Sequence, residues 1–181
     1  MAMDRAEFLE IVKDAYSAYY TILPAEEVRE ELPLAFRAEY NVRDEQYFFV
    51  KSANIWKNEK HEYCFVFSAP SFDPALAEEC IDFSLKEMLP KVKPHKEHQY
   101  TNCKVILIAD SLDDSAIAAV RKKHFSKSYG FLSTEGYTEL LAAAVDLSTE
   151  KTCANRVGRD LEPFFSKLFA LRHEETPDNG K

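Results

Sequence analysis

Glycine is scarce in this chain, which has only four glycines among its 181 residues. Loops that cradle a phosphate need clustered glycines, because the backbone must approach the phosphate closely. Neither G-x-G-x-x-G nor G-x-x-x-x-G-K occurs, and the serine motif G-x-S-x-G is absent as well. These absences exclude the usual nucleotide-binding loops and the usual motif for an acyl-transfer serine.

The four cysteines are too dispersed to form a recognisable metal site or disulfide framework. No C-x-x-C pair occurs. Three cysteines fall in predicted strands and one in a predicted helix: Cys64, Cys103 and Cys153, and Cys80. Such spacing is typical of buried, reduced thiols. We therefore predict a cytoplasmic protein that holds no metal and no cofactor.

Long apolar runs and a surplus of positive charge are lacking too. No segment approaches the ~18–20 apolar residues of a membrane span. The first ten residues, MAMDRAEFLE, have no apolar signal core. We expect no membrane contact, and the net charge of −8 argues against nucleic acid as the main partner.

The composition is that of one folded domain. Hydrophobic residues make up 46% of the chain, including 13 Phe and 9 Tyr, which is ample material for a core. Only the last residues, Glu174–Lys181, have the composition of disorder. We predict a single domain over residues 1–173 and a flexible tail over 174–181.

Apolar periodicity predicts the secondary structure. Alternating or wholly apolar segments predict strands at Leu34–Val42, Gln46–Ser52, His61–Ser68 and Cys103–Ala109. Between the first two of these, Arg43-Asp44-Glu45 is predicted to form a turn. Apolar residues three and four apart predict helices at Asp4–Tyr20, at Pro74 to about Leu89, after Asp113 or Asp114, and at Asp160–Leu171.

The segment before the last helix is ambiguous. Leu140–Leu147 and Lys151–Arg156 suit a hairpin, yet residues 137–147 are also good helix material. The overall order predicts an α+β fold, with a mixed sheet of about six strands and four main helices packed on it. Such a sheet has edges to cover, so the sequence allows a homodimer.

Positive charge is concentrated in one part of the chain. Residues 91–127 have a net charge of +4, which leaves −12 for the rest. We infer a non-enzymatic domain that binds a protein partner or a small anionic ligand through this basic segment. The candidate binding residues are Lys91, Lys93, His95, Lys96, His98 and Lys122.

The alternative to a binding site is that these basic residues form an ordinary run of charge exposed to solvent. Arg121–Lys127 is predicted to fall in the last turns of a helix, where cations oppose the macrodipole, with His124 packed on its apolar face. A second hypothesis is a metal-dependent hydrolase or nuclease-like enzyme, with Asp110, His95 and His98 as candidate ligands. Its weakness is that no third ligand follows the two histidines at a recognised interval.

The order of a helix, three antiparallel strands, a helix and a strand is similar to the core of the restriction-endonuclease-like nucleases. That resemblance implies an acidic residue on the second strand and E-x-K on the third. Here the predicted third strand reads Glu62-Tyr63-Cys64 without the lysine, and the second offers only Glu45 at its start. The resemblance therefore covers the order of elements alone and allows an inactive relative.

Several longer sequence segments resemble those of an uncharacterised bacterial family with no assigned activity. They are LPLAFRAEY, HEYCFVFSAP, KPHKEHQY and AAAVDLSTEKTCANRVGRDL. This resemblance implies a bacterial cytoplasmic protein and transfers no site residue. It makes Leu32–Tyr40, Lys93–Tyr100 and Asn155–Asp160 the first segments to probe.

Overall fold

One mixed sheet of seven strands organises the chain in the computed structural model, which describes residues 3–25, 32–45 and 57–175. The strand order is β1-β2-β3-β4-β6-β5, and β7 also pairs with β6. The strands are β1 (Thr21–Pro24), β2 (Leu34–Glu45), β3 (Lys57–Ala69), β4 (His98–Ala109), β5 (Ser126–Ser128), β6 (Tyr137–Asp146) and β7 (Lys151–Ala154). The pairs β3–β4 and β4–β6 are parallel, and the other pairs are antiparallel.

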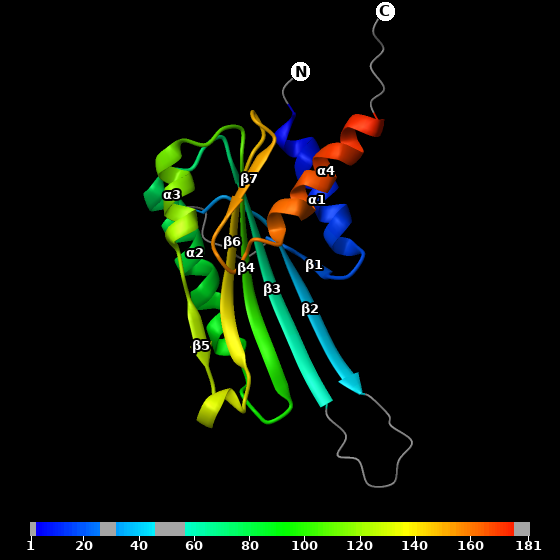
Figure 1. Ribbon diagram of the computed structural model, residues 1–181. Helices are drawn as coiled ribbons and strands as arrows, with labels where there is room; N and C mark the ends of the chain where they lie inside the picture. The colour runs from blue at the N-terminus through cyan, green and yellow to red at the C-terminus, as the bar shows by residue number, and fades with distance from the viewer. Residues whose placement is uncertain (1–2, 26–31, 46–56, 176–181) are drawn as a thin grey trace, which may run out of the picture.

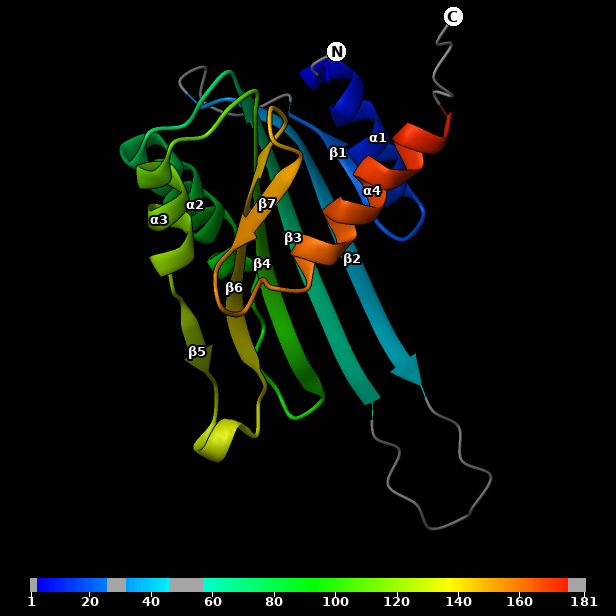
Figure 2. The ribbon, with the colours of Figure 1, turned by 45° about the horizontal axis from the view of Figure 1, so that its top comes forward.

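Helices cover both faces of the sheet, which makes three layers (Figure 1). The helices are α1 (Arg5–Ser17), α2 (Pro74–Met88), α3 (Asp114–Lys122) and α4 (Leu161–Glu175), with short 3₁₀ turns η1 (Leu89–Lys91) and η2 (Phe131–Ser133). Helices α2 and α3 lie on one face, and α1 and α4 lie on the other (Figure 2). The α+β single-sheet prediction is confirmed, with seven strands where about six were expected.

The core has two halves, because successive residues of a strand point to opposite faces of the sheet. On β4, Val105 and Leu107 pack in the half under α2, whereas Ile106 and Ile108 pack in the half under α1 and α4. This alternation explains the wholly apolar run Val105–Ala109 of the central strand. The same alternation determines which polar residues of β3 and β4 can contact each other, because only every second residue of a strand lies on a given face of the sheet.

Several local predictions are confirmed. The side chain of Asp73 caps α2, with Pro74 as the first helical residue, and the side chain of Asp113 caps α3. Residues 137–146 form strand β6, which settles the open choice between strand and helix. All four cysteines are free and buried.

Other boundaries were predicted wrongly. The predicted turn at Arg43-Asp44-Glu45 is wrong, because β2 runs through Glu45 and pairs there with Lys57 of β3. The predicted strand Gln46–Ser52 lies outside the described residues. Helix α1 ends at Ser17, and the chain then forms β1, which was not predicted. The helix predicted to hold Arg121–Lys127 ends at Lys122, so His124 lies beyond it and is exposed rather than packed.

At the C-terminal end, α4 includes Glu174 and Glu175, and the remainder of the predicted tail lies outside the described residues. No helix in the described ranges has both the length and the apolar character that a membrane crossing requires.

Candidate functional site

The basic segment is partly neutralised within the molecule. Lys91 follows α2, and its Nζ lies 2.8 Å from Oε1 of Glu39 on β2 and 4.6 Å from the ring centre of Tyr63. Lys93 and Lys96 are exposed, and neither forms an ion pair with any residue that the structure describes. The positive charge available to a partner is therefore smaller than the sequence count implies.

Lys122 lies apart from the other candidate residues. It ends α3 and lines a shallow pocket with Pro74 and Glu78 at the start of α2, whereas Lys91 lies beyond the end of α2. The 15 residues of α2 span about 20 Å. Its neighbour Lys123 is paired with carboxylates of α2, at 2.7 Å from Glu78 and 3.0 Å from Asp82.

Asp110 and the two histidines of the hydrolase hypothesis are not brought together. His98 begins β4 and Asp110 follows its last residue, so the 12-residue strand separates them by about 40 Å. Asp110 instead lies 2.5 Å from the guanidinium of Arg5. Across the described ranges, no group of three or more His, Cys, Asp or Glu side chains could hold a metal ion.

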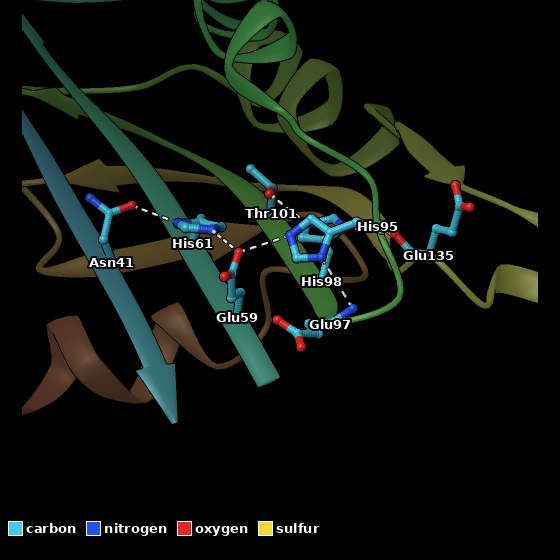
Figure 3. A network of polar contacts seen from close by, with 8 residues as sticks. All are labelled: Asn41, Glu59, His61, His95, Glu97, His98, Thr101 and Glu135. Atoms are coloured by element: carbon cyan, nitrogen blue, oxygen red, sulfur yellow. Dashed lines mark hydrogen bonds and ion pairs between the residues drawn. The ribbon is translucent and has the colours of Figure 1, made fainter. Parts of the chain in front are cut away.

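His95 and His98 belong to a cluster that we call the histidine cluster: Glu59, His61, His95 and His98 (Figure 3). Alternation on β3 places Glu59 and His61 on the same face, and His95 reaches Glu59 from the loop before β4. Oε2 of Glu59 lies 2.9 Å from Nε2 of His95 and 3.8 Å from Nε2 of His61. His61 donates from Nδ1 to Oδ1 of Asn41 on β2, at 2.7 Å.

His98 is the buried member of the cluster, with only 4% of its surface exposed. Its Nδ1 donates to the carbonyl of Glu135 at 2.8 Å, and in the neutral ring Nε2 accepts from the hydroxyl of Thr101 at 2.8 Å. Gly136 has a φ of +84°, and a Cβ there would lie 2.4 Å from Nδ1 of His98. His98 thus joins the loop before β6 to the sheet, and both of its ring nitrogens are occupied.

The cluster predicts a loss of stability at mildly acidic pH. Burial lowers the pKa of His61 from its usual 6.5, and His98 and His95 act in the same direction while Glu59 opposes them. As the pH falls, His61 takes up a proton in the unfolded chain before it does so in the folded protein. The free energy of unfolding is therefore unaffected by His61 above pH 6.5, and it declines as the pH falls from 6.5 through the lower pKa of the folded state. Urea unfolding at about pH 7.5 and about pH 5.5 measures this decline.

Exchange of His61 for glutamine is expected to reduce that decline, since the side chain no longer titrates. His124→Gln is the matched control, because His124 is exposed on the linker after α3. Equal declines in the wild type and His61→Gln would contradict the assignment.

A cavity lies on the opposite face of the sheet, between α1, α4 and strands β3, β4 and β6. Its volume is about 570 Å³. We call it the tyrosine cavity, after Tyr16, Tyr19, Tyr20 and Tyr100 in its lining, which Phe164 of α4 joins. The polar residues that line it are Glu62, Asn102, Lys104 and Asp160.

The strands of the sheet form the floor of the tyrosine cavity, where Glu62 of β3 and Lys104 of β4 make a partly buried ion pair. Nζ of Lys104 lies 2.5 Å from Oε2 of Glu62, and their side chains are only 15% and 14% exposed. Tyr20 accepts from Lys104 at 2.8 Å and donates to Glu62. Burial and the Glu62 carboxylate raise the pKa of Tyr20 well above its usual value and that of Tyr100 to about 12. Both phenols therefore remain protonated, as hydrogen-bond donors, at neutral pH.

Asn102 provides a second polar group in the cavity lining. It lies two residues before Lys104 on β4 and therefore on the same face. Its Oδ1 is buried and has no hydrogen-bond partner among the residues that the structure describes. Such atoms are uncommon in folded proteins, because an unmet buried acceptor costs free energy.

Comparison with known proteins identifies a family and no activity. A family model described as a domain of unknown function (DUF8052) matches residues 4–167. The chain belongs to this family. No curated protein and no solved structure matches it. The expectation of an uncharacterised family is confirmed, and DUF8052 assigns no role to any residue of either site.

The tyrosine cavity of this DUF8052 domain was not predicted from the sequence. Glu62 and Lys104 are 42 positions apart, and Tyr20 is a further 42 positions from Glu62. One signal was present, because Lys104 interrupts the apolar run Cys103–Ala109, and a charge in a buried strand needs a partner. The same residue bears on the nuclease resemblance, since it places a lysine beside Glu62 although E-x-K is absent.

Proposed function

We propose that this domain binds a small organic molecule in the tyrosine cavity. Ligand sites in proteins are mostly apolar or aromatic cavities of ~300–1,000 Å³ that hold a few convergent polar groups. The tyrosine cavity, at about 570 Å³, has this composition. The observation that carries the proposal is the Lys104–Glu62 pair that the sheet contributes to the cavity lining.

The charged residues Lys104 and Glu62 are not expected in a cavity that has no ligand to bind. Burying two charges costs desolvation free energy that a pair of packed apolar residues avoids. The rest of this face of β4 is apolar, with Ile106 and Ile108 packed under α1 and α4. A partly buried ion pair next to an open volume is therefore better explained by a ligand than by the stability of the fold.

The basic segment remains a separate prediction. An anionic ligand or a protein partner would meet the exposed Lys93 and Lys96, with His95 between them, while Lys91 is already engaged by Glu39. That the protein is non-enzymatic, bacterial and cytoplasmic is likewise a prediction of the sequence, which also allows a homodimer.

The alternative of a metal-dependent hydrolase or nuclease-like enzyme also stays a prediction. Lys104 beside Glu62 favours it, and the separation of Asp110 from His95 and His98 weakens the ligand set first considered.

Filling the tyrosine cavity is expected to abolish ligand binding. Ala15 of α1 lines the cavity, so Ala15→Phe places a ring inside it. Ala18, three residues further along, is exposed and does not line it, which makes Ala18→Phe the matched control. Small aromatic fragments are screened against each protein by ligand-observed NMR. We expect fragments that bind the wild type and Ala18→Phe but not Ala15→Phe.

Leu141→Phe fills the same cavity from β6 and replaces Ala15→Phe if the helix variant does not fold. A screen without hits, or hits retained by the filled variants, would contradict the proposed site.

A further inference from the structure

The charges at the floor of the tyrosine cavity compensate each other. Nζ of Lys104 lies 2.5 Å from Oε2 of Glu62, and the hydroxyl of Tyr20 donates to Glu62 and accepts from Lys104. Asp160 is the remaining charged residue among the described residues of the lining, and it is exposed, so solvent and salt screen its carboxylate. The described lining therefore offers a ligand no unpaired charge that is shielded from water.

A charged ligand group would have to break this ion pair or remain without a partner of its own. An anion would compete with Glu62 for the ammonium of Lys104, and a cation would compete with Lys104 for the carboxylate. The two side chains are only 15% and 14% exposed, so the displaced partner would lose its counter-charge where water compensates poorly. A ligand group without charge leaves the pair intact and avoids this cost.

The walls of the cavity consist largely of aromatic rings. Tyr20 after α1, Tyr100 on β4 and Phe164 on α4 contribute rings from three parts of the fold. The buried ring of Tyr16 packs edge-on against Tyr20 and Phe164, with ring centres 4.9 and 5.6 Å apart, and so holds both rings in place. Aromatic side chains bind planar rings by offset stacking and edge contacts, with little loss of side-chain entropy. The walls therefore favour a flat aromatic ligand.

From the charge balance of the floor and the aromatic walls, we propose that the ligand of the tyrosine cavity is an uncharged aromatic molecule. This inference rests on the proposed function and adds the chemical class of the ligand to it. The aromatic ring lies among Tyr20, Tyr100 and Phe164, and the Lys104–Glu62 pair stays intact when the ligand binds.

Three probes that share a benzene ring and differ in the charge of one head group test the charge of the ligand: benzyl alcohol, benzoate and benzylammonium. We expect benzyl alcohol to bind the wild type at least about tenfold more tightly than either charged probe, because a charged head group loses hydration or breaks the ion pair. Titrations followed by protein NMR measure the three affinities. Equal or tighter binding of benzoate or benzylammonium would overturn the inference of an uncharged ligand.

Glu62→Gln keeps the shape of the side chain and removes the counter-charge of Lys104. In this variant we expect benzoate to bind more tightly than benzyl alcohol, which reverses the wild-type order, because the carboxylate of the probe can now pair with the ammonium. Glu10→Gln removes the same charge from an exposed position of α1 outside the cavity lining, and this control is expected to keep the wild-type order. An unchanged order in Glu62→Gln would overturn the role of the charge balance. Should Glu62→Gln not fold, the wild-type order of the three probes tests the same inference.

Phe164→Leu tests the aromatic walls, because it keeps an apolar side chain and removes a ring. We expect it to weaken the binding of benzyl alcohol at least about threefold, since the stacking and edge contacts of that ring are lost. Phe131→Leu is the control, because Phe131 is 83% exposed and lies outside the cavity lining. Equal affinity of the two variants for benzyl alcohol would overturn the inference of an aromatic ligand.

The two proposals fail in different ways. Comparable binding of all three probes, abolished by Ala15→Phe, rejects the ligand class and supports the cavity as the site. Absence of benzyl alcohol binding, together with binding of other fragments that Ala15→Phe excludes, also rejects the ligand class and supports the cavity. Absence of any cavity-dependent binding rejects both proposals.

Discussion

Replacing Lys104 by methionine is expected to lower the free energy of unfolding by about 3 kcal/mol, because it leaves the largely buried Glu62 carboxylate without its cation, although Tyr20 still donates to it. The two side chains are 15% and 14% exposed, so solvent replaces little of the lost interaction. Methionine has a similar length and keeps the packing of the aliphatic stem. Urea unfolding followed by circular dichroism measures the change.

Two further variants separate the ion pair from general effects of the substitution. Lys104→Met combined with Glu62→Leu removes both charges and is expected to recover most of the lost stability. Lys91→Met breaks the more exposed pair with Glu39 and is expected to cost less than about 1 kcal/mol. Equal costs for Lys104→Met and Lys91→Met would contradict the description of the cavity floor.

Replacing Asn155 by alanine is expected to be similarly destabilising, at about 3–4 kcal/mol, because four backbone groups lose a hydrogen bond to its side chain and three of these bonds are buried. Oδ1 of Asn155 accepts from the N–H groups of Ala142 and Gly158, at 3.1 and 2.8 Å. Its Nδ2 donates to the carbonyls of Leu140 and Lys123, at 2.9 and 3.1 Å. One side chain therefore connects β6, the end of α3 and the turn before α4.

Asn102→Ala is the matched control for this experiment. Asn102 is also an asparagine on the sheet, but its Oδ1 makes no hydrogen bond to the described residues, so its loss is expected to cost less than about 1 kcal/mol. Urea unfolding of both variants gives the comparison. A small cost for Asn155→Ala would contradict the network. These hydrogen bonds also give a structural role to the segment Asn155–Asp160, which belongs to one of the sequence stretches that resemble the uncharacterised family. Within that segment, Asn155 connects β6 to the end of α3 and to the turn before α4.

Elements with strong local signals were predictable from the sequence. The apolar run at Val105–Ala109 fixed the central strand, and Asp73 with Pro74 fixed the start of α2. Strand β1 was missed because four residues are too few for a pattern, and its pairing with β2 stabilises it. The turn predicted at Arg43-Asp44-Glu45 failed because the long β2–β3 pairing overrides the local preference of these charged residues for a turn.

The candidate sites were less predictable, because their contacts join residues far apart in sequence. Lys91 meets Glu39 across 52 positions, so a count of charge along the chain overestimated the free positive charge. His95 and His98 were recognised as neighbours, but their partners Glu59 and Glu135 come from β3 and from the loop before β6. The tyrosine cavity required the relative position of α1, α4 and the sheet.

A crystal structure of the protein grown with a fragment that the NMR screen identifies tests the central claim most directly. We predict that the fragment lies in the tyrosine cavity, in contact with Tyr20, Tyr100 and Phe164, with the Lys104–Glu62 contact retained. A fragment bound only at another surface, or a cavity closed by its own side chains in the crystal, would contradict the assignment of this cavity as the ligand site.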